Sequence, residues 1–275
     1  MSDTIAAPPR RQRFTPQTLL AGSGVLWFSI AAAGQWLFAY YIIGAYVPRT
    51  ASGEFERWNE TGLIEGYAQG DLIGNLGFIS HVLLAAFVSV AGVMQLLPII
   101  RRRFPTFHRW NGRAYMSVAA FLAVGGILLV WVRGTRMNDL AAMGTTIDGL
   151  LILVTAGFTL RHAIARRIDQ HRRWAMRLFV VVNGVWFVRV GYMAWAIASG
   201  GAGMSRSLNG PADILMPYAA FLVPLVLLEF YMRARDSRSS GFKLAVTAMI
   251  CVGAGVTALG LFGAWMMMWS PNIQY

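Results

Sequence analysis

The sequence predicts an all-α protein, a polytopic transmembrane bundle of about seven helices with its N-terminus in the cytoplasm. The chain is 56% hydrophobic and only 13% charged, whereas soluble domains carry about 25% charged residues. The apolar residues fall into seven runs, each long enough to cross a bilayer as a helix, which takes ~20 residues. The runs are continuous and do not alternate at period two, and this excludes an outer-membrane barrel.

The seven runs are mostly joined by short connections, so we expect consecutive helices to be antiparallel neighbours. Arg10, Arg11 and Arg13 precede the first run, as in a signal peptide. This run is about twice as long as the core of a signal peptide, which indicates an uncleaved first helix. The runs occupy residues 19–47, 74–100, 114–133, 146–165, 178–199, 213–232 and 244–269.

Basic residues distinguish the two sides of the bundle. If the N-terminus is cytoplasmic, the N-terminal tail and every second connection hold 18 of the 24 basic residues. Five lie on the opposite side, and Arg189 lies inside a run. This bias is the positive-inside pattern, typical of a bacterial inner-membrane protein of this orientation. The net charge of +12 therefore indicates contact with anionic lipid headgroups on the cytoplasmic side, and not with nucleic acid.

The chain is expected to form one transmembrane domain over residues 16–275, after a disordered basic tail over residues 1–15. The connection over residues 48–73 is acidic and has room for a short interfacial helix. The single cysteine, Cys251, excludes an intrachain disulfide.

Two basic turns of similar sequence follow the second and fourth runs. Residues 101–115 read RRRFPTFHRWNGRAY, and residues 166–179 read RRIDQHRRWAMRLF. Their equivalent places raise the hypothesis of two related hairpins, and chance similarity between short arginine-rich stretches is the competing interpretation.

The stretch GVMQLLPIIRRRFPTFHRWNGRAYM and the later HRRWAMRLF resemble a bacterial family of predicted multi-pass membrane proteins, domain of unknown function 2306. The resemblance covers residues 75–200 and implies no established activity. One departure from the family's pattern is Ala175, which stands between Trp174 and Met176. More weakly, the chain is similar to four-helix cytochromes that hold haem between helices. The matching residues are Gln95, His108, Arg109, Gly112, Arg113 and Tyr115, then His171, Arg172, Trp174, Met176 and Arg177.

His108 and His171 are candidate ligands of a haem b. Both are expected near the cytoplasmic interface, where two neutral imidazoles at equal depth would bind the iron axially. His162 would lie close to them. The alternative is structural, because Arg, His and Trp are ordinary residues at such turns. Arginines suited to the haem propionates are Arg109, Arg113, Arg172 and Arg177.

Three local contacts are also expected near the cytoplasmic turns. Gly112 would permit a tight turn into the third helix. Arg109 and Arg113 would cap the carbonyl ends of neighbouring helices. Glu229 would reach Arg233, one helical turn further along the chain.

Arg189 is expected near the middle of the fifth run, where an arginine costs at least ~2.5–3.5 kcal/mol. It should therefore face a polar pocket inside the bundle. One interpretation is an ion pair between Arg189 and Asp148, and the other is an anionic or carbonyl-bearing ligand, such as a quinone or a haem propionate. His81 would bind iron or carry a proton, but it differs from His162 by ~14 Å in depth, too much for one shared haem. The residues assigned to the pocket are His81, Asp148, Trp186, Arg189 and Tyr192, with Gln35, Asn75 and Gln95 as additions.

The sequence favours two classes of function. One is an electron-transfer protein that holds haem b or a quinone between the second and fifth runs. The other is a non-catalytic membrane protein, such as a transporter, a sensor or an accessory subunit of a membrane complex. The sequence contains no Walker A, dinucleotide-binding or nucleophile-elbow motif. The motifs therefore assign no enzymatic reaction to the chain. The histidines form no zinc-binding motif, and no metal site is expected.

Overall fold

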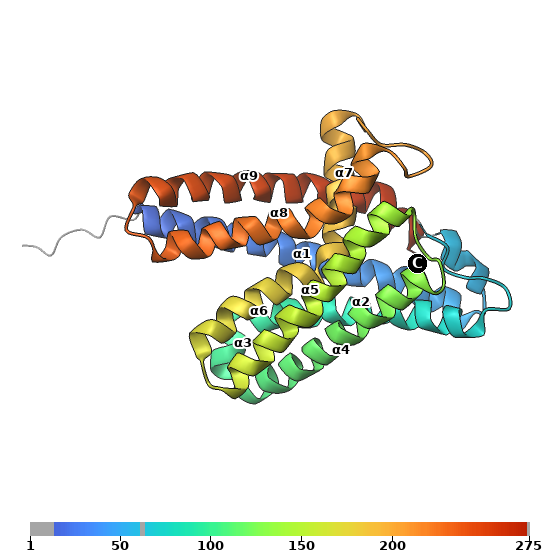
Figure 1. The fold of residues 1–275 in the computed structure, drawn as a ribbon, viewed down its shortest axis with the longest axis horizontal. Helices are drawn as coiled ribbons and strands as arrows, with labels where there is room; N and C mark the ends of the chain where they lie inside the picture. Colours follow the sequence, from blue (N-terminus) through green and yellow to red (C-terminus); the bar gives the residue numbers. More distant parts are fainter. Residues whose placement is uncertain (1–13, 61–63, 274–275) are drawn as a thin grey trace, which may run out of the picture.

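The structure is a computed structural model that describes residues 14–60 and 64–273 (Figure 1). Every regular element in these residues is a helix. Six helices are long and apolar enough to cross a membrane, and one bent pair makes a seventh candidate span. The predicted polytopic bundle of about seven helices is thus confirmed. Of the tail predicted for residues 1–15, only Phe14 and Thr15 belong to the described residues.

Side-chain caps begin several of the helices. Thr15 caps α1 (Pro16–Ala51), where its hydroxyl accepts the backbone N–H of Thr18. Asp71 caps α2 (Leu72–Leu96) by accepting the N–H of Gly74. Such caps satisfy N–H groups that have no partner within the helix. The acidic connection between α1 and α2 contains the 3₁₀ helix η1 (Phe55–Glu60), as the sequence predicted.

Prolines divide the first basic turn. α2 is followed by the short α3 (Pro98–Arg103) and then by α4 (Pro105–Trp131). Proline lacks the backbone N–H and clashes with a preceding helical turn, so it begins a helix more readily than it continues one. Leu97 and Phe104, the residues before these prolines, accordingly leave the helical conformation.

The fifth predicted run is not one helix, and that prediction was wrong. α5 (Asp139–Ile164) leads into α6 (Ile168–Val182), and the chain then bends by 56° into α7 (Gly184–Ser199). The last long helices are α8 (Pro211–Asp236) and α9 (Ser240–Ala264). After α9, the described chain ends in a π-helical segment, Trp265–Trp269, and a 3₁₀ turn, Ser270–Asn272.

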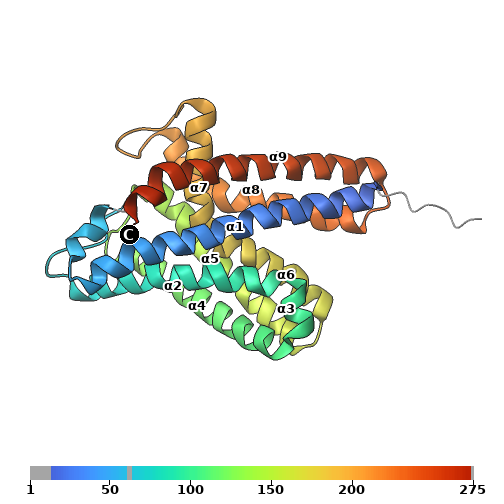
Figure 2. The same cartoon turned by 180° about the vertical axis from the view of Figure 1, so that it is seen from behind.

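The helices form two arms that diverge toward one end of the molecule (Figure 1). One arm holds the first half of α1 with α8 and α9, and the other holds α2 to α6. Figure 2 shows α1 between α9 and α2, and α1 packs against both. The start of α1, α3, the α5–α6 turn and the α8–α9 turn all lie at the divergent end, which we call the basic end.

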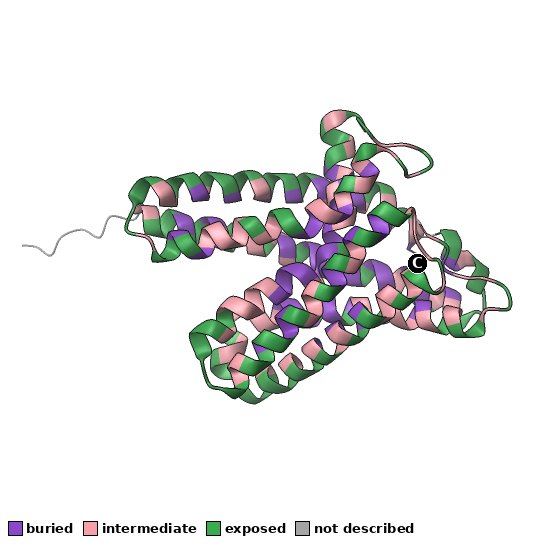
Figure 3. Cartoon of the chain, in the orientation of Figure 1, coloured by how far each residue is buried: buried purple, intermediate pink, exposed green. Residues whose placement is uncertain are grey.

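Buried residues concentrate where the two arms meet (Figure 3). The largest apolar cluster joins side chains of α1, α2 and α7 with Trp269 and Ile273 near the C-terminus. A second cluster lies among α2, α4, α5 and α6. The arms themselves expose mainly apolar side chains, as expected of helices whose solvent is lipid.

Candidate ligand site at a helix break

The bend between α6 and α7 is centred on Asn183 and Gly184, both buried. Asn183 partly replaces the interrupted helical bonding, because its Nδ2 donates to the Phe179 carbonyl at 2.7 Å and its backbone N–H donates to the Val180 carbonyl. Within a membrane, interrupted helices occur only where protein or water surrounds them. Such breaks form the binding sites of many transporters.

Asp148 of α5 packs directly onto this break. A Cβ placed on Gly184 would lie 2.0 Å from Oδ2 of Asp148, so the carboxyl group needs glycine opposite it. Oδ1 of Asp148 is buried and has no hydrogen-bond partner among the described residues.

Arg189, on α7, contacts other groups than Asp148, its partner in the predicted ion pair. Its guanidinium donates to the Val185 carbonyl at 3.1 Å and lies over the ring of Phe38, 5.5 Å from the centroid. Within residues 14–60 and 64–273, no ion pair joins Arg189 to Asp148. That interpretation is therefore wrong, and a cation–π contact with α1 takes its place.

His81 of α2 lies in the same neighbourhood. The charge of Arg189 acts on its imidazole, and a Cβ on Gly126 of α4 would lie 3.2 Å from its Cε1. The next residue, Ile127, packs against Gly149, which follows Asp148. His81 and Asp148 are therefore at the same level of the bundle, on neighbouring sides of α4.

Trp186 and Gln35 extend this site to α1. A Cβ on Gly34 would lie 2.5 Å from Cζ2 of Trp186, so α1 and α7 approach closely here. Gln35 follows Gly34 and is 1% exposed. We call Gln35, His81, Asp148, Trp186 and Arg189 the polar cluster.

Polar atoms of this cluster are buried without partners. In the described part of the chain they are Nε2 and Oε1 of Gln35, Nδ1 of His81, Oδ1 of Asp148 and Nε1 of Trp186. A buried polar group left without a hydrogen bond costs about 1–3 kcal/mol, so native structures contain few of them. Two of these atoms, Nε1 of Trp186 and Nε2 of Gln35, are N–H donors, which suit a ligand whose oxygens accept hydrogen bonds.

Three residues predicted for the pocket lie elsewhere. Tyr192 Oη donates to the Asp213 carbonyl at 2.9 Å. Asn75 accepts from Arg133 at 2.7 Å, near the start of α2. Gln95 donates from Nε2 to the His108 carbonyl at 3.2 Å, at the basic end.

His108, near the start of α4, and His171, near the start of α6, both lie at the basic end, close enough for electrostatic interaction. Nδ1 of His171 lies 3.0 Å from the Thr159 carbonyl. A carbonyl accepts only from a protonated nitrogen, so this contact places the proton on Nδ1 and leaves Nε2 free. The contact of His162 is with neither of these histidines: its ring stacks on Phe158, with 6.4 Å between the centroids.

Gly112 has a different role from the predicted turn. It lies within α4, where a Cβ would be 3.1 Å from Oε1 of Gln95. The glycine thus makes room for the Gln95 side chain, which then reaches the His108 carbonyl.

The arginines of the two motifs share one arrangement. Arg113 lies over Trp110 and Arg177 over Trp174, each at 4.7 Å and each three residues beyond its tryptophan. Arg109 donates to Thr106, and Arg172 is 3.8 Å from Asp169. The hydrogen bonds of Arg109 and Arg113 within the described chain include none to a helix-end carbonyl, so the predicted capping is wrong.

A pair of ion bridges between α6 and α8 was missed from the sequence. Arg177 binds Glu229 with two hydrogen bonds, of 2.6 and 3.0 Å, and Arg173 pairs with Asp236. We call these two pairs the clasp. Glu229 therefore pairs with Arg177 of the other arm. The predicted contact between Glu229 and Arg233 is wrong. Only the spacing of Arg173 and Arg177, which puts both on one face of a helix, hinted at the clasp.

The comparison with protein families identifies the chain. A model of the family "Predicted membrane protein (DUF2306)" matches residues 78–232, more than half of the 275 residues. The chain belongs to this family. Neither the curated proteins nor the solved structures contain a match.

The DUF2306 segment extends further than the sequence resemblance indicated. It ends at Met232 and so includes most of α8, with Glu229 of the clasp. Four members of the polar cluster lie inside it, and Gln35 of α1 lies outside. Gln95, His108 and His171, three of the residues on which the sequence resemblance rested, lie at the basic end.

Proposed function

We propose that this multi-pass membrane protein binds a lipid-soluble carbonyl compound of the quinone class at the polar cluster, as a component of membrane electron transfer. The observation that carries the proposal is the group of unpartnered polar atoms on Gln35, His81, Asp148 and Trp186, buried beside a helix break. Carbonyl oxygens of a quinone head group would accept from Trp186, Gln35 and Arg189. The apolar tail of such a compound would remain among the lipid-facing helices.

Binding of decylubiquinone to the purified protein in lipid nanodiscs tests this proposal. We expect Gln35→Leu and Trp186→Phe each to raise the Kd about tenfold, because a lost hydrogen bond is worth ~1.4 kcal/mol in a dry site. Gln35→Leu should also raise the melting temperature of the ligand-free protein, since it removes an unsatisfied amide.

Thr257→Val is the matched control. Thr257 is buried in α9 and donates to the Gly253 carbonyl, outside the polar cluster. Equal Kd values for all variants, or binding that does not saturate, would contradict the proposal.

A second candidate function, haem b binding, is favoured by one observation at the basic end. The contact between Nδ1 of His171 and the Thr159 carbonyl orients the imidazole and leaves Nε2 free, as in metal-binding histidines. His108 would supply the second axial ligand. Of the arginines suggested for the propionates, Arg177 is already bound to Glu229, so Arg109, Arg113 and Arg172 would fill that role.

Absorption spectra of the detergent-purified protein, oxidised and reduced, test whether it binds haem b. A bound haem b predicts a Soret band that shifts on reduction and is lost in His108→Ala and His171→Ala. His162→Ala should keep the band, because His162 stacks on Phe158, apart from the pair. A featureless spectrum at stoichiometric loading excludes haem. A transporter, a sensor or an accessory subunit predicts neither quinone binding nor a Soret band.

We further propose that the protein lies in the bacterial inner membrane with the basic end in the cytoplasm. Labelling by a membrane-impermeant maleimide from outside tests this orientation. In a Cys251→Ser background, Glu56→Cys should react in intact spheroplasts and Arg102→Cys should not; both positions are exposed at opposite ends. The reverse labelling pattern would overturn it.

A further inference from the structure

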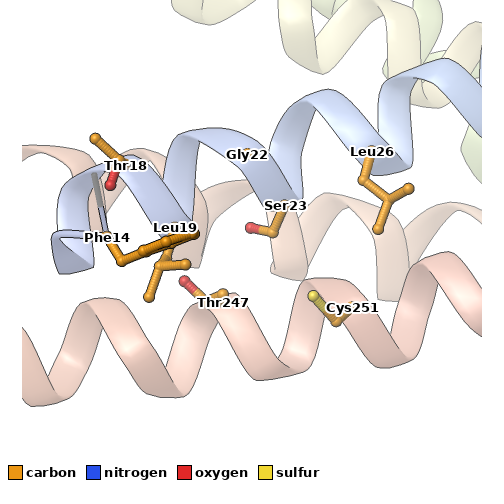
Figure 4. A pocket seen from close by; sticks show the side chains of 8 residues that line it. All are labelled: Phe14, Thr18, Leu19, Gly22, Ser23, Leu26, Thr247 and Cys251. Atoms are coloured by element: carbon orange, nitrogen blue, oxygen red, sulfur yellow. The ribbon is translucent and has the colours of Figure 1, made fainter.

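A groove of about 360 Å³ runs between α1 and α9 near the start of α1 (Figure 4). Thr18, Gly22 and Leu26 line it from one face of α1, since they recur every four positions, and Phe14 lines it from just before the helix. On α9, Thr247 and Cys251 line it with the same spacing. The groove opens on the side of the molecule that faces the bilayer, because Phe14, Leu26 and Cys251 are exposed.

The walls of this groove favour an apolar occupant. The hydroxyl of Ser23 donates to the Leu20 carbonyl at 2.9 Å, and that of Thr247 donates to the Lys243 carbonyl at 2.8 Å. These polar groups are thus satisfied within their own helices. A Cβ added to Gly22 would have no neighbour within 4 Å among the described residues, so the groove is empty of protein atoms above this glycine. In a membrane, such a space is filled by a hydrocarbon chain.

The charge at the mouth of the groove is positive. Lys243 precedes Thr247 by four residues and therefore lies one turn closer to the basic end on the same face of α9. The two carboxylates at the end of α8, Glu229 and Asp236, are taken up by Arg177 and Arg173 of the other arm. The ion pairs of the described residues therefore leave Lys243 and Arg238 without a carboxylate.

We propose that this groove holds one acyl chain of an anionic phospholipid, whose phosphate group binds Lys243. The apolar walls select a hydrocarbon chain, and the uncompensated charge selects an anionic head group over a zwitterionic one. This site is independent of the polar cluster and of the proposed quinone binding.

The chain offers a specific probe for the test, because Cys251 and Lys243 are its only cysteine and only lysine. A small fluorescent label on Cys251 would be quenched by lipids with brominated acyl chains that enter the groove. We expect stronger quenching by brominated phosphatidylglycerol than by brominated phosphatidylcholine at the same mole fraction. Lys243→Gln should reduce this preference about fivefold, as for loss of one basic residue at an anionic membrane surface.

Two further variants make the test specific. Gly22→Leu should reduce quenching by both lipids, since its side chain fills the empty space above this glycine. In the control, Cys251→Ser with Val252→Cys, the label moves to the neighbouring exposed position and should show no head-group preference. Native mass spectrometry of the unlabelled protein gives a second readout: retained phosphatidylglycerol should be lost in Lys243→Gln and in Gly22→Leu.

Equal quenching by the two lipids in the unaltered sequence would overturn the proposal. So would excimer emission between Cys251 pyrene labels together with weak lipid quenching, because the occupant would then be a second copy of the chain.

Discussion

At the scale of single residues, Arg133 links two segments distant in sequence. Its guanidinium donates to Asp71 at 2.8 Å, to Asn75 at 2.7 Å and to the Gly66 carbonyl at 3.1 Å. Asp71 meanwhile caps α2. One side chain from the segment just after α4 thus contacts both the start of α2 and the connection before it.

This contact makes stability depend on pH. The hydrogen bond from Arg133, together with that from the Gly74 N–H, lowers the pKa of Asp71 from its ordinary value of 3.8. A carboxyl group whose pKa is lower in the folded state stabilises the fold above the unfolded pKa, and this stability is lost as pH falls through the folded pKa. We therefore expect Asp71→Asn to lower the melting temperature at neutral pH and to flatten its decline below about pH 3.8.

Thermal unfolding of both proteins across the acidic range measures this effect. Asp169→Asn serves as a control, because its side chain is 94% exposed and 3.8 Å from its nearest arginine, Arg172. Parallel curves for the unaltered protein and Asp71→Asn would show that Asp71 contributes nothing to the pH dependence.

At the scale of elements, the break between α6 and α7 was the feature that the sequence did not predict. The run over residues 178–199 is nearly all apolar, so composition alone indicates one continuous span. Asn183 and Gly184 are weak helix formers, but isolated residues of this kind also occur inside helices. Beside the break, Asp148 fills the space next to Gly184, and this contact comes from a residue 36 positions away.

Gly184→Ala is therefore expected to destabilise the protein by about 1–3 kcal/mol, as overpacking does in a filled core. Gly157→Ala, in open space on α5, should be neutral or stabilise by up to about 1 kcal/mol, because alanine favours the helix. Unfolding in increasing SDS measures both.

A double variant makes the cause specific. Asp148→Ala should restore much of the stability lost in Gly184→Ala, because it removes the atoms that clash. If Gly184→Ala is as stable as Gly157→Ala, the close contact with Asp148 does not shape the break.

Prediction succeeded for features that depend on local sequence and failed for those that depend on packing. The spans follow from long apolar runs. His81, Asp148, Trp186 and Arg189 could be singled out as candidates from the sequence because polar groups are costly inside a membrane. Gln35 joins them as the buried residue next to Gly34, which packs on Trp186, whereas Tyr192 donates to the Asp213 carbonyl. Depth along a helix can be counted from the sequence, but the direction of a side chain depends on its neighbours.

At the scale of the whole molecule, the clasp links the two arms through two ion pairs. Arg177 and Glu229 are only 20% and 33% exposed at their side chains, so water screens this pair incompletely. The sequence could not identify the pair, because its members are 52 positions apart.

A double-mutant cycle on Arg177→Ala and Glu229→Ala should give a coupling of about 1.5–3 kcal/mol, the range for hydrogen bonds to charged groups. The same cycle on Arg172 and Asp169, which are exposed and 3.8 Å apart, should give less than ~1 kcal/mol. Unfolding free energies of the four proteins in each cycle provide the values. Equal couplings would mean that the clasp is no stronger than a surface pair.

The clasp also has a mechanical consequence. It fastens α6 to α8, while α6 continues into α7 only through the non-helical Asn183. The bend between α6 and α7 lies beside Trp186 and Arg189 of the polar cluster. A change in the angle between the arms at the basic end would therefore move α6 and alter the backbone angle at this bend.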